Sequence, residues 1–205
     1  MKVHNVEQRS EAWYALRSGM PTASEFKSLI TSTGKPSKSI TPYAYRLAGE
    51  VLAGPSVGSW GGNNDMERGR TLEEDAAAWY SFVNDVDVED IGFITDDNER
   101  MGCSPDKLVA SDGLLEIKCL NTEKHVAVIV EHETTGKVPA AYIQQVHGQM
   151  LISERDWCDL VFHHHQLGGY VIRIHKDEEM ETAILNGIDE LIKTRDRALD
   201  ILRRV

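Results

Sequence analysis

The sequence predicts an α/β or α+β fold in which a central sheet is flanked by helices. Three observations support this prediction. Helical patterns fill the first third of the chain and its C-terminal end, and short runs rich in strand-forming residues gather from Val86 onward. The 205 residues are 41% hydrophobic and 27% charged, an ordinary composition for a globular chain long enough to bury one sizeable core.

The first part of the chain predicts helices. Trp13 lies on the apolar side of a helical stretch, and Thr22-Ala23-Ser24-Glu25 is a capping-box pattern, which opens a helix. Asn64 or Asp65 is a cap for a longer helix of about five turns. The expected helices therefore cover residues 7–16 and 22–30, start again at Thr41-Pro42 and, after a glycine-rich connection over 54–64, continue through the long helix that carries Glu73.

The second part predicts strands and two more helices. Gly168-Gly169 joins the last two strand-like runs, which is a hairpin signal. Pro139 precedes a helix over 140–152, and Asp177 caps a long amphipathic helix over 177–205. The expected strands are 91–95, 107–110, 114–120, 159–164 and 170–175.

Charge is distributed unevenly. The net charge of -11 is unusual for a protein that binds nucleic acid, because such binding normally neutralises phosphates with basic residues. Residues 1–50 carry seven basic and four acidic residues, a balance of +3, so the remainder carries -14. The N-terminal quarter is therefore the expected phosphate-facing part, and a solvated, mildly basic face is the alternative.

Other signals concern compartment. The N-terminus is polar and has no apolar stretch typical of a signal peptide, and no run approaches the length of a membrane span. The cysteines, Cys103, Cys119 and Cys158, show no CxxC spacing and indicate neither a zinc ribbon nor a disulfide framework. We expect a cytoplasmic protein without membrane association.

The stretch from Cys103 to Cys119 carries the clearest chemical pattern. In a strand, Glu116 and Lys118 share one face while Ile117 points to the other, toward the core. Asp112-Gly113 is a turn dipeptide between two apolar runs, so a hairpin there brings Asp106 alongside Glu116. Two carboxylates and one ammonium group then converge at the edge of a sheet.

Such a cluster suits phosphodiester hydrolysis. Carboxylates that hold two Mg²⁺ ions can activate a water and stabilise charge on the phosphate. Asp106 and Glu116 are the natural pair, with the main-chain carbonyl of Ile117 as an extra ligand. Glu73 can complete the shell, and Lys118 can orient the water or stabilise the developing charge. The alternative is a solvated hairpin with a cross-strand ion pair.

Six motifs, two of which lie in this hairpin, occur together in chain order: Trp13-Tyr14-Ala15-Leu16-Arg17, Thr22-Ala23-Ser24-Glu25, Gly69-x-x-x-Glu73-x-Asp75-Ala76, Cys103-Ser104-Pro105-Asp106, Gly113-Leu114-Leu115-Glu116-Ile117-Lys118-Cys119 and Ala141-Tyr142-Ile143-Gln144-Gln145-Val146. The set resembles the phage lambda-type exonuclease family, also described as YqaJ-like viral recombinases. The resemblance covers roughly residues 13–150, and the strand-strand-helix ending is similar.

The resemblance implies a restriction-endonuclease-like core, a central mixed sheet flanked by helices. Residues 1–205 would form a single nuclease domain, with a helical DNA-end-binding part over 1–64 and the catalytic core over 65–205. The implied activity is processive, Mg²⁺-dependent 5′-to-3′ digestion of one strand of linear double-stranded DNA, with Mn²⁺ as a substitute ion. The product is a 3′ single-stranded overhang for recombination by strand annealing.

The resemblance also implies partners and residue roles. The partners are 5′-phosphorylated DNA ends, two further copies in a ring-shaped homotrimer, and a single-strand annealing protein in a bacterial host infected by a phage. The residues that match the metal-binding and catalytic positions are Glu73, Asp106, Glu116 and Lys118. Gln145 matches a glutamine beside the metals, and Asp96 a further functional acid, with adjacent Asp97 as the other register. The residues that match the 5′-phosphate site are Arg17, Ser24 and Ser104.

Three alternatives remain at this point. An endonuclease on the same core would cut closed circular DNA, and an iron–sulfur exonuclease would need four cysteines where this chain has three. A catalytically inactive DNA-end-binding scaffold is the alternative outside enzymes. Competent side chains at all four catalytic positions argue against it. The pattern assigns no role to Trp60 or to the histidines at 163–165.

Overall fold

The structure is a computed structural model that describes residues 1–54 and 63–205, with side chains described outside residues 55–70. The helical elements are α1 (Glu11–Arg17), the 3-10 helix η1 (Ala23–Ser28), α2 (Ile40–Ala53), α3 (Asn63–Asn84), α4 (Thr122–Thr135), α5 (Ile143–Ser153) and α6 (Glu178–Leu202). The strands are β1 (Lys2–His4), β2 (Val88–Glu89), β3 (Phe93–Thr95), β4 (Gly102–Cys103), β5 (Lys107–Val109), β6 (Gly113–Cys119), β7 (Trp157–His164) and β8 (Gly168–His175).

Two sheets organise the described strands. The larger has five strands in the order β2-β5-β6-β7-β8, and the smaller has three in the order β1-β3-β4. In the larger sheet β6 and β7 run parallel, whereas the other neighbouring pairs are antiparallel. The predicted fold class, a central mixed sheet flanked by helices, is therefore confirmed.

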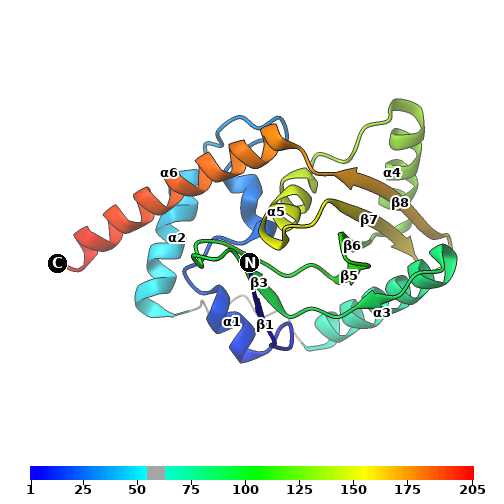
Figure 1. The fold of residues 1–205 in the computed structure, drawn as a ribbon, viewed down its shortest axis with the longest axis horizontal. Coiled ribbons are helices and arrows are strands. Elements are labelled where there is room, and N and C mark those ends of the chain that lie inside the picture. Colours follow the sequence, from blue (N-terminus) through cyan, green and yellow to red (C-terminus); the bar gives the residue numbers. More distant parts are fainter. Residues whose placement is uncertain (55–62) are drawn as a thin grey trace.

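Helices cover both faces of the five-stranded sheet (Figure 1). On one face, an apolar cluster that includes Leu114 of β6 packs against α5 and α4. On the other face, a cluster that includes Leu115 and Ile117 packs against α3. Because successive side chains of a strand alternate, Glu116 and Lys118 share the α5 face with Leu114. The chemistry-bearing side chains of β6 thus point toward a helix.

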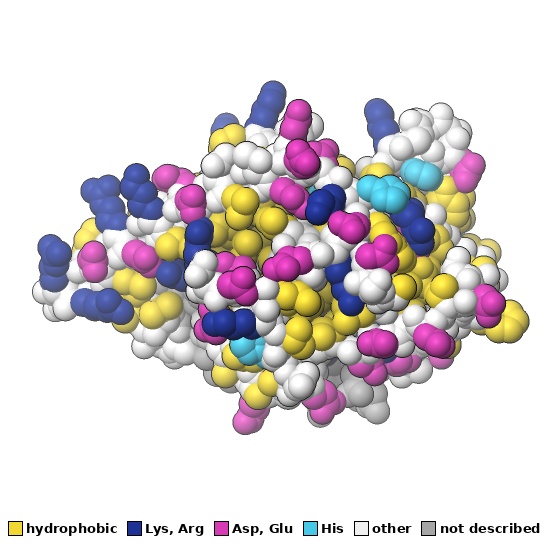
Figure 2. All heavy atoms as spheres, in the orientation of Figure 1, with side chains coloured by type: hydrophobic (Ala, Val, Ile, Leu, Met, Phe, Trp, Pro, Cys, Tyr) yellow, Lys and Arg dark blue, Asp and Glu magenta, His cyan; other side chains and the backbone are white. Residues whose placement is uncertain are grey.

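A third apolar cluster joins the N-terminal helices to the rest of the fold. Phe26 of η1, Leu47 of α2 and Ile184 of α6 are buried in it. α2 and α6 lie side by side, and α6 extends to the C-terminus at the far end of the molecule (Figure 1). Lys and Arg side chains gather over that end, whereas carboxylates are spread over the middle of the same face (Figure 2).

The N-terminal helices differ from the expectation in two details. α1 begins at Glu11 and not at residue 7, because the Ser10 side chain caps it by accepting a hydrogen bond from the Trp13 backbone. The stretch expected as a second α-helix is the shorter η1, and Thr22 makes no side-chain cap hydrogen bond there. The capping-box pattern therefore predicted the position of this helix correctly, but the helix is a 3-10 helix and not an α-helix.

Helix α4 is an element that the sequence pattern did not predict. Asn121 caps its start by accepting a hydrogen bond from the Lys124 N–H at 3.0 Å, and Gly136 ends it in the left-handed region at φ 68°. β-Branched residues in its interior weaken the helical pattern. Residues 55–62 of the glycine-rich connection, which include Trp60, lie outside the described residues. None of the described helices is long and apolar enough to cross a membrane.

Gly148 lets α5 approach η1 closely. A Cβ at this position would lie 2.4 Å from Cδ2 and 2.6 Å from Cε2 of Phe26, whose side chain is fully buried. We expect Gly148→Ala to destabilise the protein by about 1–3 kcal/mol, because the core has no room for the methyl group. Chemical denaturation measures the change. The control is Gly49→Ala in α2, where a Cβ would meet nothing within 4 Å. Equal stabilities of the two variants would contradict the prediction.

Candidate active site

The hairpin of β5 and β6 places Asp106 opposite Glu116. Lys107 pairs with Leu115 in the antiparallel register, so Asp106 at the start of β5 lies across from the next residue of β6. The Asp106 backbone N–H donates to the Leu115 carbonyl at 3.2 Å. Its carboxylate Oδ2 accepts the Ile117 backbone N–H at 2.6 Å. The expected convergence of these carboxylates at a hairpin is therefore present.

Glu116 is buried beneath α5 and is not on a solvated strand face. It is 2% exposed, and three donors hold its carboxylate. Oε1 accepts hydrogen bonds from Lys118 Nζ and Gln145 Nε2, each at 2.6 Å. Oε2 accepts a hydrogen bond from Gln149 Nε2 at 2.6 Å. A buried carboxylate with this many donors is fixed in orientation and stays compensated by the positive charge of Lys118.

Lys118 lies between Glu116 and the ring of Tyr142. Its Nζ is 5.3 Å from the centroid of that ring and 3.5 Å from Gln145 Oε1. Burial by itself lowers the pKa of Lys118, but the charge and hydrogen bond of Glu116 outweigh burial and raise that pKa above its usual value. Lys118 therefore keeps its proton at neutral pH and presents a fixed positive charge.

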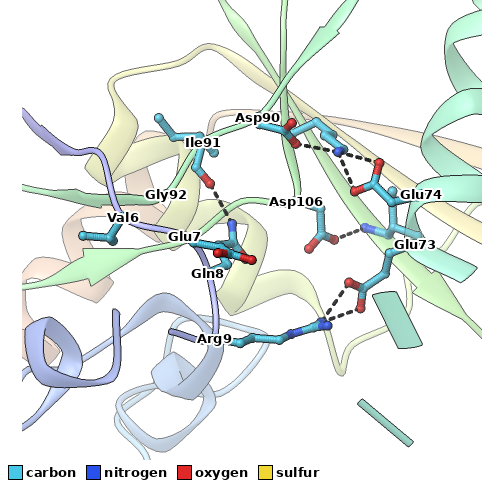
Figure 3. A pocket seen from close by; sticks show the side chains of 12 residues that line it. Val6, Glu7, Gln8, Arg9, Glu73, Glu74, Asp90, Ile91, Gly92 and Asp106 are labelled. Carbon is cyan, nitrogen blue, oxygen red and sulfur yellow. Dashed lines mark hydrogen bonds and ion pairs between the residues drawn. The ribbon is translucent and has the colours of Figure 1, made fainter. Parts of the chain in front are cut away.

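A cleft of about 370 Å³ opens beside the hairpin. Figure 3 shows Glu73 of α3 and Asp106 on one side of it and the segment that precedes α1 on the other. Arg9 of that segment donates from Nη2 to both oxygens of Glu73 at 2.8 Å. In the wall of the cleft, Lys107 Nζ contacts Glu74 at 2.8 Å and Asp90 at 2.6 Å. The cleft thus combines carboxylates with cations that partly neutralise them.

The side chains around the cleft offer carboxylate oxygens, which are suitable ligands for a divalent cation. Burial raises the pKa of Asp106 well above its usual range, and the charge of Glu116 raises it further. A bound cation would supply the positive charge that these carboxylates lack. Oxygen donors are the ligands that Mg²⁺ and Mn²⁺ prefer. Among the described residues, no three His, Cys, Asp or Glu side chains converge on one point, since Glu73 turns to Arg9 and Glu116 to α5.

A second group of predicted residues meets where α1 faces the start of η1. Arg17 Nη2 donates to Thr22 Oγ1 at 3.3 Å and to Ser24 Oγ at 3.4 Å. Trp13 Nε1 donates to Ser104 Oγ at 2.7 Å, and the Arg17 guanidinium stacks on the Trp13 ring with its Cζ 4.0 Å from the centroid. The residues expected to receive a 5′-phosphate, far apart in sequence, therefore form one contact group, which we call the anion pocket.

The electrostatics of this pocket favour an anion. Burial lowers the pKa of Arg17, which shows that its charge is poorly solvated. In the part of the chain that the structure describes, no carboxylate forms a salt bridge with Arg17. Hydroxyl groups of Ser24 and Thr22 are its partners instead. A phosphate would give the guanidinium the strong, charged acceptor that these hydroxyls replace.

Asp96 does not join either group. Its Oδ1 accepts the backbone N–H groups of Arg100 at 2.6 Å and Met101 at 3.1 Å, so the side chain closes the turn after β3. Asp97, the other register, pairs with the N-terminal ammonium of Met1 at 2.8 Å. Neither residue lines the cleft. In the folded chain the Asp96 carboxylate caps a turn outside the cleft, and its expected role as a catalytic acid stays a prediction.

Two residues whose side chains contact the predicted metal-binding carboxylates were absent from the sequence-based set. Gln149 follows Gln145 by one helical turn on α5, and this i, i+4 spacing could have predicted that both reach the same carboxylate. Arg9 gave no local signal, because its partner Glu73 lies 64 positions away. Long-range contacts of this kind are visible only in the folded chain.

A mixed sheet that bears paired carboxylates and a charged lysine beside an open cleft is the arrangement expected of a nuclease. Comparison with known proteins agrees. The YqaJ-like viral recombinase domain matches residues 12–156. The chain belongs to this family, and the family supports a nuclease role on DNA. Among curated protein sequences, none matches the chain.

Solved structures show the same relationship. The crystal structure of an alkaline exonuclease (LHK-Exo) from Laribacter hongkongensis has 30% sequence identity and a TM-score of 0.80, over 95% of this chain and 97% of that one. LHK-Exo in complex with dAMP gives the same values. A phage-related exonuclease from Haemophilus somnus 129PT has 18% identity and a TM-score of 0.70, over 89% of this chain and 96% of that one, and shows the fold alone.

Proposed function

We propose that this chain is a Mg²⁺-dependent exonuclease that digests one strand of linear double-stranded DNA processively from its 5′ end. The 3′ single strand that remains would serve recombination by strand annealing. One observation carries the proposal: the anion pocket and the acidic hairpin are continuous through Ser104-Pro105-Asp106. Ser104 contacts Trp13 of the pocket, and Asp106 contacts β6. An end-binding pocket next to a hydrolytic centre is what an end-dependent nuclease needs.

In this proposal Glu73, Asp106, Glu116 and the Ile117 carbonyl hold two Mg²⁺ ions, for which Mn²⁺ can substitute. The ions, when bound, supply an activated water and neutralise charge on the phosphate. Lys118 places a positive charge where charge develops on the reacting phosphate. Gln145 holds Glu116 and contacts Lys118, so it orients both groups. Asp96 is the further functional acid in this proposal, and its carboxylate also caps the turn after β3.

The direction of digestion follows from the pocket. Arg17, Ser24 and Ser104 would bind the terminal 5′-phosphate, and the bond that reaches Asp106 and Glu116 would lie just inside that end. The pocket comes from residues 1–64 except for Ser104, and the acids come from residues 65–205, which supports the division into an end-binding part and a catalytic core within one domain.

The proposed assembly is a homotrimeric ring in the bacterial cytoplasm, of phage origin, that works with a single-strand annealing protein. A ring linked topologically to DNA can hold its substrate without strong bulk attraction, so an acidic exterior with net charge -11 is compatible with DNA binding. A monomer that digested long DNA without dissociating would contradict this assembly.

The test compares linear DNA that carries a 5′-phosphate with the same DNA that carries a 5′-hydroxyl, in Mg²⁺. We expect faster digestion of the phosphorylated end. Arg17→Gln should slow digestion of that end roughly 10- to 100-fold, because two charge-assisted hydrogen bonds are lost, and should leave the hydroxyl end almost unchanged. A gel assay of strand length against time measures both rates.

The matched control for this test is Arg46→Gln. Arg46 also lies over an aromatic ring, that of Tyr43, but it pairs with the Glu25 carboxylate and should not contribute to the preference. Equal digestion of both ends by the unaltered enzyme would remove the end-recognition role of Arg17. Digestion of covalently closed circular DNA would point to an endonuclease, and absence of digestion with retained end binding would point to a scaffold.

A further inference from the structure

We infer that Arg9 is a displaceable counter-ion: it neutralises Glu73 until a divalent cation replaces it, and its side chain then binds a phosphate of the DNA backbone in the cleft. The inference rests on the proposed function in one respect, since it takes Glu73 as a metal ligand. It adds a residue that the nuclease motifs do not contain and a reason why metal and DNA would bind together.

The ion pair between Arg9 and Glu73 is exposed enough to be displaced. Arg9 Nη2 lies 2.8 Å from each oxygen of Glu73, so the guanidinium covers the carboxylate that a cation would need. The two side chains are 29% and 32% exposed, and both line the cleft with Asp106 (Figure 3). An ion pair this open to water is weak, so a doubly charged ion can replace the guanidinium.

Another pair in the same chain shows the contrast. Asp159 is 3% exposed, accepts two hydrogen bonds from Arg173 and a third from the Tyr80 hydroxyl, and is part of the interior. Glu73 has no such burial. The difference indicates that Arg173 holds a structural carboxylate, whereas Arg9 covers a carboxylate with another use.

The backbone around Arg9 is fixed so that its side chain points into the cleft. Arg9 has φ 69°, in the left-handed region that favours glycine, and such strain is retained mainly where a side chain must be aimed. The preceding Gln8 donates to the carbonyls of Ile91 at 2.9 Å and Pro105 at 3.0 Å. The following Ser10 caps α1. With both neighbours anchored, the Arg9 side chain is the part that can move.

The cleft determines what a displaced Arg9 can bind. A guanidinium released from Glu73 would be next to Asp106 and within the N-terminal part that carries the anion pocket. Its planar fork matches two oxygens of a phosphate. DNA in the cleft would present such phosphates. Arg9 would therefore contact DNA only after metal has taken Glu73, which couples the two binding events.

The first measurement is Mn²⁺ affinity, read from the electron paramagnetic resonance signal of free Mn²⁺ without DNA. If Arg9 competes with the ion, Arg9→Gln should bind Mn²⁺ about 3- to 10-fold more tightly than the unaltered protein. Arg9→Met removes the charge that contacts Glu73 and should also bind Mn²⁺ more tightly, which keeps the test usable if Arg9→Gln does not fold. Unchanged or weaker binding by the folded variants would overturn the inference, because Arg9 would then merely position Glu73.

The second measurement is the salt dependence of DNA affinity in a Lys118→Ala background, which prevents cleavage. With Mn²⁺ present, Arg9→Gln should reduce the slope of log affinity against log salt by about 0.9, the value for one lost phosphate contact. Without Mn²⁺ the slope should not change. If Arg9→Gln reduces this slope equally with and without Mn²⁺, or reduces it in neither condition, the metal-coupled contact is overturned.

Two further proteins separate this inference from the proposed function. Arg100→Gln removes an arginine that pairs with Asp189 and does not line the cleft, so it should match the unaltered protein in both measurements. Glu73→Gln should bind Mn²⁺ more weakly. If the unaltered protein binds Mn²⁺ and digests DNA but Arg9→Gln binds Mn²⁺ no more tightly, only the inference fails. If the unaltered protein neither binds Mn²⁺ nor digests DNA, the proposed function fails as well.

Discussion

Lys118→Ala is expected to lower the rate of DNA digestion roughly 10²- to 10⁴-fold while DNA affinity stays within a few-fold of the original. The reason lies in its surroundings. Lys118 is held by Glu116 at 2.6 Å and by Gln145 at 3.5 Å, and the charge and hydrogen bond of Glu116 keep its pKa high. A side chain fixed in this way contributes a charge at one position and little to general attraction of DNA. Digestion of end-labelled linear DNA and a filter-binding assay measure the two effects.

Two checks separate a catalytic effect from a structural one. Lys176→Ala removes a lysine that is 46% exposed and pairs with Asp156 at 3.3 Å, and it should leave digestion unchanged. The thermal unfolding midpoint of Lys118→Ala shows whether Glu116 still packs against α5. Unchanged digestion by Lys118→Ala would defeat the proposed mechanism.

Arg173→Met is expected to lower the free energy of unfolding by about 3–5 kcal/mol. Arg173 donates to Asp159 from Nε at 2.8 Å and from Nη2 at 2.9 Å. The Tyr80 hydroxyl of α3 donates to the same carboxylate at 2.6 Å. Without Arg173 the buried charge of Asp159 loses its counter-ion, and the link between α3 and the sheet weakens. Because α3 carries Glu73, activity should fall along with stability.

A double variant identifies the cause of that loss. Adding Asp159→Leu removes the buried charge, so the double variant should recover part of the stability that Arg173→Met loses. Lys176→Met is the control at an exposed pair and should change stability by less than about 1 kcal/mol. If the double variant is less stable than Arg173→Met alone, lost packing of Arg173 on the Trp157 ring, 3.9 Å away, is the main cause. Urea denaturation measures all three proteins.

Local patterns predicted the hairpin well. The alternation of Glu116, Ile117 and Lys118, together with a turn signal, was enough to place Asp106 across from Glu116, because both features act over short distances along the chain. The same patterns did not predict how deeply Glu116 is buried. Its burial depends on α5, which is distant in sequence and packs on that face.

Contacts between distant segments explain what the sequence left open. The pocket of Arg17, Ser24 and Ser104 was expected only through family resemblance, since no spacing rule relates α1 and η1 to the segment that precedes β5. The structure brings these residues together through Trp13. Asp96 has a contact that family resemblance did not predict: its carboxylate caps backbone N–H groups of the turn after β3. Its role as a functional acid stays a prediction.

The link Ser104-Pro105-Asp106 has a consequence for the size of the product. Two residues of extended chain span about 7 Å, and proline fixes one of the dihedral angles between them. In the proposed function, covalent geometry would therefore set the distance between the end-binding residue Ser104 and the hydrolytic residue Asp106. The enzyme would then cut at the same distance from each new strand end, whatever the bases are, and would release products of one size.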